Sequence, residues 1–354
     1  MKKRNVAVVI PAHNEEKVIA STLHSVIKIV PSRDVYVIDD GSKDKTTKIS
    51  RKFIKHVIKI NNRGKAYALN FGIKHYKLTR KYDFIFFIDA DTKPDPSFLE
   101  KAMFRFEKDK RKKTVCVIGQ VKSTGNNWIS KYRQWEYFVS HYIHKKAQEN
   151  LRSILVAPGC STVYRSKIFN KLAFPEGTLT EDMDFTFLLH RHGFDKMIFE
   201  AKAIVRTQDP QTLPDFMKQI KRWYTGFWQV VRKHNVPWQG QILDIEVSML
   251  ALEGLYNGLI VIFFILSIIP LVVSRHLNIY VIPLSIDLIG VFMPSLIISS
   301  IIDKDYTRIL FAPAFYLLRF LSSITFIISF FSGYLSTEKT YSWDSNRYQQ
   351  KGAY

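Results

Sequence analysis

Three long apolar stretches in the last third of the sequence restrict the fold more than any other feature. They cover residues 255–273, 279–302 and 309–331, and each has about the 20 residues that a helix needs to cross a bilayer. Backbone inside a bilayer must satisfy its own hydrogen bonds, so these stretches are expected to be helical. The sequence therefore predicts a transmembrane region of two or three helices over 246–335 and a polar tail over 336–354.

Polar residues inside these stretches leave the number of crossings open. Asp287 is costly in lipid unless it faces protein or water, and the third stretch contains Pro313 and Arg319. Three crossings would put the tail on the side opposite the amino-terminal domain, whereas a re-entrant third stretch would keep both on one side. The charges of the short loops are balanced, so the positive-inside rule selects neither arrangement.

The first 120 residues alternate short β-branched runs with helical stripes. This alternation is typical of right-handed βαβ units and a parallel sheet. The ligands of such sheets bind beyond the carboxyl ends of the strands. We therefore expect a Rossmann-like α/β catalytic domain with a mostly parallel sheet over 1–210. The predicted strands are 6–10, 35–38, 56–60, 84–88 and 115–118.

Charge and cysteine content narrow the class of protein further. The formal net charge is +21, and acidic and basic residues balance after residue 245, so the excess lies in the amino-terminal part. Such a domain attracts anionic lipid or phosphorylated substrates, and no nucleic-acid-binding signature accompanies it. Cys116 and Cys160 are too few for a disulfide framework. With no signal peptide before the first strand, the amino-terminal domain is expected to be cytosolic.

An amphipathic helix is predicted before the apolar stretches, within 211–245. Lysine and arginine flank an aromatic stripe there, which is typical of a helix in the membrane interface. A helix packed into a protein core is the alternative, and the apolar stretches that follow favour the interface. The stripe consists of Phe216, Ile220, Trp223, Phe227 and Val230.

Acidic pairs follow two of the predicted strands. Asp89 and Asp91 come directly after 84–88, and a continuing strand would point both carboxylates to one side. Two close carboxylates repel unless a cation lies between them, and Mg²⁺ is usually held by one or two carboxylates plus substrate phosphates. Asp39 and Asp40 occupy the equivalent position after 35–38, where an ordinary turn with a capping aspartate is the alternative.

Three further groups have side chains suited to a charged substrate. Lys65 opens a helical pattern whose first amides would suit phosphate. Asp182 follows Glu181 near a helix start, where a carboxylate can act as a base or as a cap. Gln219 and Arg222 share a helix face with Trp223. Arginine binds diphosphate through its planar fork, and tryptophan offers a flat surface to a sugar ring.

Together these motifs resemble the processive family 2 glycosyltransferases with a GT-A fold, such as hyaluronan, chitin, cellulose and poly-N-acetylglucosamine synthases. The resemblance covers the amino-terminal two thirds, and Trp343-Asp-Ser-Asn-Arg347 is similar to the ending of several such synthases. The motifs are Val9-Ile-Pro-Ala-His-Asn-Glu15, Asp39-Asp-Gly-Ser42, Arg63-Gly-Lys65-Ala66, Asp89-Ala-Asp91, Pro158-Gly-Cys-Ser161, Thr180-Glu-Asp182 and Gln219-x-x-Arg222-Trp223.

The resemblance implies a role for each motif. Asp182 would be the catalytic base with Glu181 orienting, and Asp91, with Asp89 beside it, would coordinate Mg²⁺ or Mn²⁺. Trp223, Gly159 and Cys160 would contact the acceptor. The remaining residues would bind the donor, with the uridine held by Pro11, Asn14, Glu15 and Asp40 and the diphosphate by Lys65, Arg222 and Gln219.

The implied function is an inverting transfer of sugar from a UDP-sugar to a glycan acceptor at the cell membrane, forming a β-linkage, with N-acetylglucosamine as the first candidate. Family synthases usually have transmembrane helices before the catalytic domain, and none is predicted here, so a homo-oligomer or a partner membrane subunit is one expectation. A non-processive enzyme acting on a polyprenyl phosphate or glycolipid is a second. A non-catalytic, basic, membrane-tethered binding protein is the alternative from another class.

Overall fold

A computed structural model describes residues 5–274 and 284–335. The predicted polar tail, with Trp343 and Arg347, and residues 279–283 of the second apolar stretch lie outside these residues. The described chain forms two compact units. The first contains Met1–Thr124 and His144–Pro210, and the second contains Gly125–Ile143 and Gln211–Thr337. Each unit is described by itself.

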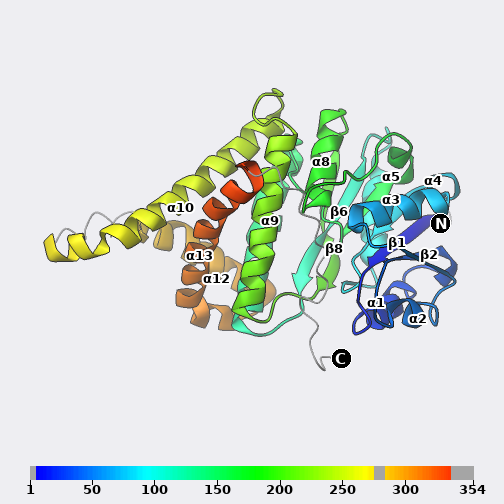
Figure 1. The fold of residues 1–354 in the computed structure, drawn as a ribbon, viewed down its shortest axis with the longest axis horizontal. Helices are drawn as coiled ribbons and strands as arrows, with labels where there is room; N and C mark the ends of the chain where they lie inside the picture. Colours follow the sequence, from blue (N-terminus) through cyan, green and yellow to red (C-terminus); the bar gives the residue numbers. More distant parts are fainter. Residues whose placement is uncertain (1–4, 275–283, 336–354) are drawn as a thin grey trace. The chain divides into compact units, whose positions relative to one another are not determined.

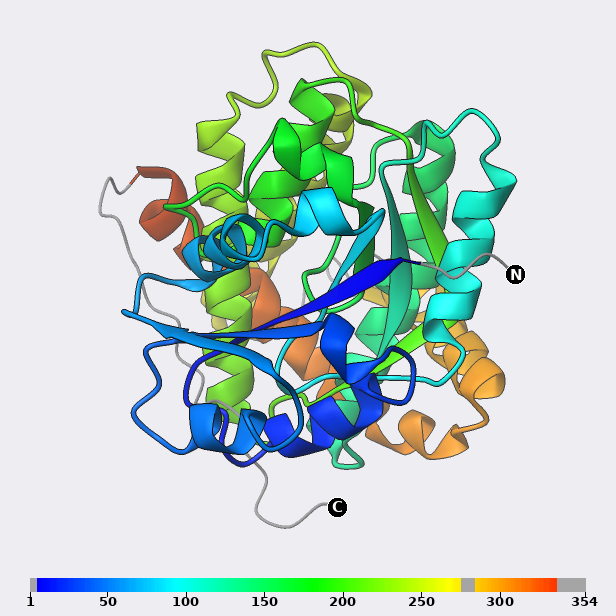
Figure 2. The ribbon, with the colours of Figure 1, turned by 90° about the vertical axis from the view of Figure 1, so that its right-hand side faces the viewer.

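The first unit is built on one mixed sheet in the order β3-β2-β1-β4-β7-β6-β8-β5 (Figure 2). Six strands run in one direction, and only β7 and β5 run against them. The strands are β1 Val6–Ala12, β2 Val35–Asp40, β3 His56–Ile60, β4 Phe84–Phe87, β5 Lys93–Pro94, β6 Cys116–Ser123, β7 Thr162–Arg165 and β8 Met197–Thr207.

Helices cover both faces of this sheet because neighbouring strand residues point to opposite sides. Phe86 stacks on Phe98 of α5 on one face, with ring centroids 4.5 Å apart. Phe87 on the other face meets Phe174 at 5.2 Å, in a core that includes Leu69 of α3 and Phe185 of α8. The helices of this unit are α1 Ile19–Val26, α2 Thr46–Ser50, α3 Lys65–His75, α4 Leu78–Lys81, α5 Phe98–Lys108, α7 Lys146–Leu151 and α8 Glu181–Arg191.

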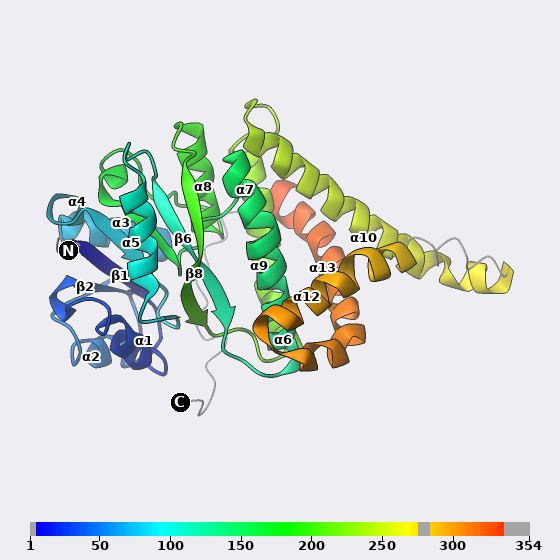
Figure 3. The ribbon, with the colours of Figure 1, turned by 180° about the vertical axis from the view of Figure 1, so that it is seen from behind.

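The second unit is helical. Figures 1 and 3 show α13 between α9 and α10, and both neighbours contact it. The helices are α6 Trp128–Phe138, α9 Leu213–Lys233, α10 Ile242–Ser274, α12 Met293–Asp303 and α13 Ala312–Phe330, with π-helical turns η4 Ile286–Phe292 and η6 Phe331–Leu335 and the 3-10 helix η5 Tyr306–Phe311.

Three helical stretches in the described residues are long and apolar enough to cross a membrane: Ile242–Ser267, Ile286–Asp303 and Tyr306–Leu335. They correspond to the three apolar stretches of the sequence. The carboxylate of Asp287 meets Arg319 through two contacts of 2.7 and 2.9 Å and accepts the hydroxyl of Tyr316 at 2.8 Å. Asp287 therefore has protein partners, which is one of the two surroundings that reduce the cost of a carboxylate in lipid.

The apolar stripe of α9 is buried within the second unit. Phe216, Ile220 and Val230 are almost fully buried, and the first two join a cluster with Tyr132 of α6 and Phe315 of α13. This face packs into a protein core, which was the alternative named from the sequence, and contact of the rest of the helix with a membrane interface stays a prediction. The basic residues flanking the stripe remain at the surface, as Lys218 and Lys221 show.

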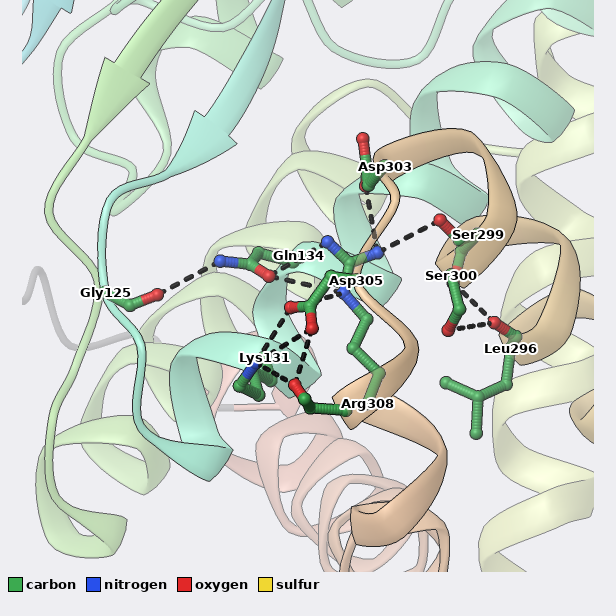
Figure 4. A network of polar contacts seen from close by, with 10 residues as sticks. Gly125, Lys131, Gln134, Leu296, Ser299, Ser300, Asp303, Asp305 and Arg308 are labelled. Atoms are coloured by element: carbon green, nitrogen blue, oxygen red, sulfur yellow. Dashed lines mark hydrogen bonds and ion pairs between the residues drawn. The ribbon is translucent and has the colours of Figure 1, made fainter.

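A buried arginine ties the turn between α12 and α13 to α6 (Figure 4). The guanidinium of Arg308 donates to the side chain of Gln134 at 2.9 Å and pairs with Asp303 at 2.9 Å. Lys131, also on α6, pairs with Asp305 of the same turn at 2.8 Å. Because breaking a buried charge pair leaves an uncompensated charge, these contacts hold α6 beside the turn.

Two glycines allow α10 to approach α13 closely. Cβ atoms built on Gly254 and Gly258 would lie 2.5 Å from Phe326 and 2.6 Å from Ile327. The second would also lie 2.7 Å from the carbonyl oxygen of Ser323, which is backbone and has little freedom to move. The spacing Gly-x-x-x-Gly is the one by which small residues bring apolar helices together.

Gly258→Ala is therefore expected to lower the thermal stability of the protein in detergent. Forcing a methyl group into a filled contact typically costs about 1–3 kcal/mol. The matched control is Gly290→Ala, since a Cβ on Gly290 meets nothing within 4 Å. Equal melting temperatures for the two variants would contradict the close contact between α10 and α13.

Candidate functional site

The loops after β1 and β2 hold each other through backbone amides. Asn14 has a φ of 54°, and its N–H donates to the hydroxyl of Ser42 at 2.8 Å while its side-chain oxygen accepts the N–H of Lys43 at 2.7 Å. The N–H of Glu15 donates to the hydroxyl of Thr46 at 2.7 Å. These contacts join the two motifs predicted to hold a nucleoside, and Pro11 lies buried in β1 just before them.

Asp40 has a structural partner that the sequence did not reveal. Its carboxylate accepts the N–H groups of Arg63 and Gly64 at 2.9 and 2.8 Å. Burial raises the pKa of Asp40, and the two amides oppose that shift. The two amides that precede α3 are thus bound to a carboxylate, which fixes the backbone leading into Lys65.

Asp89 and Asp91 lie in a turn, because β4 ends at Phe87. The expectation that a continuing strand aligns the two side chains is therefore wrong. The N–H of Thr92 closes the turn on the carbonyl oxygen of Asp89 at 3.1 Å, and the hydroxyl of Thr92 donates to Asp91 at 3.0 Å. Both aspartates keep part of their surface in solvent.

Lys65, the first residue of α3, joins two of the predicted acidic motifs. Its Nζ lies 2.6 Å from Oδ1 of Asp89 and 3.0 Å from Oε1 of Glu181. Burial favours the neutral amine, but Asp89, Glu181 and Asp182 together raise the pKa of Lys65 well above its usual value. The side chain is therefore a fixed cation at neutral pH.

Asp182 lies in the first turn of α8, beside the loop that precedes β7. Its Oδ2 accepts the N–H of Gly159 at 3.2 Å and its Oδ1 accepts the N–H of Met183 at 2.8 Å. Burial raises the pKa of Asp182 and Glu181 raises it further, while Lys65 acts against both. A carboxyl with a raised pKa is suited to accept a proton near neutral pH.

Gly159 and Cys160, in the loop before β7, lie close to the charged groups around Lys65. A Cβ on Gly159 would lie 3.1 Å from Nζ of Lys65 and 3.7 Å from Oε1 of Glu181. Burial raises the pKa of the Cys160 thiol, and Asp89 raises it further. The hydroxyl oxygens of Ser161 and Thr180 are buried with no hydrogen-bond partner among the described residues.

Lys145 is a buried cation that the sequence analysis did not identify. Its Nζ donates to the carbonyl oxygen of Val156 at 2.7 Å. Burial lowers the pKa of Lys145 to about 8, although Asp182 acts in the opposite direction. No sequence signal marks it, because it is one lysine among many in a basic domain.

Gln219, Arg222 and Trp223 lie on α9 in the second unit, where Arg133 of α6 holds two of them. The guanidinium of Arg133 donates to the side-chain oxygen of Gln219 and lies 4.6 Å from the ring centre of Trp223. It also pairs with Glu136 at 2.6 Å. The sequence contains one signal for Arg133, which is its spacing of four residues from the apolar Ile129. This spacing places both residues on one face of a helix, and Ile129 is buried in the structure.

Asp89 and Asp91 are the residues predicted to coordinate a divalent cation. Within 5–274 and 284–335, no three His, Cys, Asp or Glu side chains gather as a metal site. Two carboxylates fit Mg²⁺ or Mn²⁺ nevertheless, because these ions take one or two carboxylates and complete their shell with substrate phosphate and water. Such a site is complete only when a phosphate ligand is bound.

The first unit thus brings together most of the predicted site residues. Lys65 connects Asp89 with Glu181, Asp182 bonds to Gly159, and Asp40 anchors the backbone before Lys65. The roles assigned to all of these residues stay predictions, as do those of Gln219, Arg222 and Trp223 in the second unit.

Comparison with known proteins identifies the domain. The model of the glycosyl transferase family 2 matches residues 7–173. A poly-beta-1,6-N-acetyl-D-glucosamine synthase of Staphylococcus epidermidis is 27% identical over 245 residues, which cover 64% of this chain and 57% of the relative. A probable glycosyltransferase of Bacillus subtilis, YdaM, is 29% identical over 241 residues, covering 64% and 56%.

A glucosyl-3-phosphoglycerate synthase from Mycobacterium tuberculosis, solved with Mn²⁺ and UDP-glucose, is 21% identical, with a TM-score of 0.46 and coverage of 67% of this chain and 81% of that one. The chain spans a little over half the length of the curated relatives named above. The mixed, mostly parallel sheet agrees with the GT-A architecture that the resemblance implied. Residues 7–173 match the glycosyl transferase family 2 model, and the curated relatives named above are a synthase and a probable glycosyltransferase.

Proposed function

We propose that this protein transfers a sugar from a UDP-sugar to a glycan acceptor at the cytosolic surface of a membrane and forms a β-linkage by inversion. The observation that carries the proposal is the ammonium of Lys65 between Asp89 and Glu181. It joins the motif that would bind a metal to the motif that would supply a base. The names of the Staphylococcus relatives support N-acetylglucosamine as the sugar, and the three apolar helices support a membrane location.

Separate groups of residues would bind the uridine and the diphosphate of the donor. Asn14, Glu15 and Asp40, with Pro11, would contact the uridine, where the loops after β1 and β2 are held together. Lys65 and Arg222 would bind the diphosphate. Asp89 and Asp91 would hold Mg²⁺ or Mn²⁺, which when bound neutralises the diphosphate as a leaving group.

The transfer would be a single displacement at the anomeric carbon. An acceptor hydroxyl gives its proton to Asp182 as its oxygen bonds to the anomeric carbon, and the bond from that carbon to the diphosphate oxygen breaks. The electron pair of the broken bond stays on the diphosphate, which Lys65 would contact. Cations positioned where negative charge develops lower the barrier of such a step.

The test is a screen of uridine and guanosine diphosphate sugars with the purified full chain in detergent. Release of free nucleoside diphosphate is measured with Mg²⁺, with Mn²⁺ and with a chelator. We expect UDP release from UDP-N-acetylglucosamine that requires the metal. No release from any nucleotide sugar under these conditions would overturn the proposal and favour a binding protein.

The products of the same reactions identify the acceptor class. A ladder of lengths on a gel is expected for a processive synthase. One discrete lipid-linked species would instead indicate a polyprenyl phosphate or glycolipid acceptor, which the sequence left open as an alternative.

Arg133→Met is expected to weaken acceptor use more than donor use. The variant keeps an apolar side chain but loses the bond to Gln219 and the cation over Trp223, so the face that would meet the acceptor is no longer held. The KM for acceptor should rise about tenfold, the effect of losing roughly 1.4 kcal/mol of positioning. The KM for donor should rise less, since Lys65 and Arg222 would still bind the diphosphate without Gln219 in place. Arg133→Lys should recover part of the loss, and a general loss of folding would instead affect both substrates equally.

A further inference from the structure

Lys65 and a divalent cation would both bind the carboxylate of Asp89. Oδ1 of Asp89 accepts the ammonium at 2.6 Å, and the same side chain is one of two available to a metal in the proposed function. A metal bonds carboxylate oxygen at about 2.1 Å. A metal on this carboxylate would therefore lie beside the ammonium, and like charges so close repel strongly where water is scarce.

The ammonium is held where it is by the fold. Asp40 fixes the backbone of Gly64 immediately before Lys65, and Glu181 supplies the second anionic contact at 3.0 Å. Only 18% of the Lys65 side chain is exposed. Moving it away from Asp89 without a new anionic partner would leave a poorly solvated charge with Glu181 alone in place of two carboxylates, which is costly.

We infer that Lys65 competes with the divalent cation for Asp89, so that the metal binds well only together with a nucleoside diphosphate. The inference rests on the proposed function. A diphosphate offers oxygens to both cations. The ammonium can leave Asp89 for the diphosphate, and Asp89 then becomes available to the metal.

The test is Mn²⁺ binding to the nucleotide-free protein, measured by calorimetry or by the electron paramagnetic resonance signal of free Mn²⁺. Lys65→Met removes the ammonium and keeps an unbranched apolar side chain. We expect it to bind Mn²⁺ at least about tenfold more tightly than the unmodified protein, because one repelling charge beside the site is gone. Lys65→Arg keeps the charge and should bind Mn²⁺ as weakly as the unmodified protein.

Lys74→Met is the matched control, since Lys74 is exposed near the end of the same helix. It should leave Mn²⁺ binding unchanged. Thermal melting of each variant establishes that it is folded, and Lys65→Gln replaces Lys65→Met if that variant unfolds. Equal or weaker Mn²⁺ binding by the folded neutral variant overturns the inference.

A second measurement separates this inference from the proposed function. Binding of UDP to the unmodified protein is measured with and without Mn²⁺. If UDP and Mn²⁺ bind together but Lys65→Met does not gain affinity for Mn²⁺ alone, only the competition fails. If UDP does not bind in the presence of Mn²⁺, the proposed function fails and the inference fails with it.

Discussion

Replacing Asp182 by asparagine is expected to slow sugar transfer by about 10²–10⁴-fold, the usual contribution of a positioned base. Asparagine has nearly the same shape and still accepts the N–H of Gly159, so the loop beside it should keep its place. What is lost is the group that takes the acceptor's proton. The measurement is the steady-state rate of UDP release with saturating donor and acceptor.

The control is Asp195→Asn, which changes a surface aspartate that pairs with Arg152 at 3.8 Å. Exposed pairs of this kind contribute little, so the rate should not change. Full turnover by Asp182→Asn would remove Asp182 from the role of base and direct attention to Glu181 beside it.

The rate of the unmodified enzyme should also depend on pH through the protonation of Asp182. Because burial and Glu181 raise the pKa of Asp182, the base becomes protonated as the pH falls through that raised pKa, and transfer should slow there. A carboxyl whose pKa is raised by folding stabilises the folded state less as the pH rises through its folded-state pKa. At a pH above that pKa, the melting temperature of Asp182→Asn should therefore equal or exceed that of the unmodified protein. The difference between the two melting temperatures should become smaller as the pH falls below that pKa.

The strands predicted from the sequence were those with a strong local signal. All five have counterparts in the sheet, and β3 coincides with its prediction at His56–Ile60. β7 was missed because four residues give too short a pattern, and nothing local shows that it inserts antiparallel between β4 and β6. β8 was missed because the register shift between Gly119 and Gln120 of its partner breaks the alternation of buried and exposed residues along it.

For the candidate site, too, some features were predictable from the sequence and others were not. The acidic motifs were recognisable because carboxylates after apolar strands are unusual, but their partners are far away in the sequence. Lys65, which was expected to bind phosphate, also joins Asp89 to Glu181. Asp40 was expected to contact a nucleoside, and its carboxylate also accepts the backbone N–H groups of Arg63 and Gly64. Only the three-dimensional contacts reveal these pairings, since no local pattern encodes them.

Replacing Asp91 by asparagine is expected to lower kcat/KM on the order of 10²-fold or more, since a metal site with two carboxylates loses half of its negative charge. The oxygen that accepts the hydroxyl of Thr92 remains, so the turn should persist. A weakened site is recovered in part by more metal. The midpoint of activation in a Mn²⁺ titration should therefore move to higher concentration, with nucleotide present throughout. Asp95→Asn is the control, because Asp95 follows the same turn and pairs with Arg206 near the surface at 3.0 Å. An unchanged Mn²⁺ midpoint for Asp91→Asn would mean that this carboxylate is no ligand, and that Asp89 alone serves the metal.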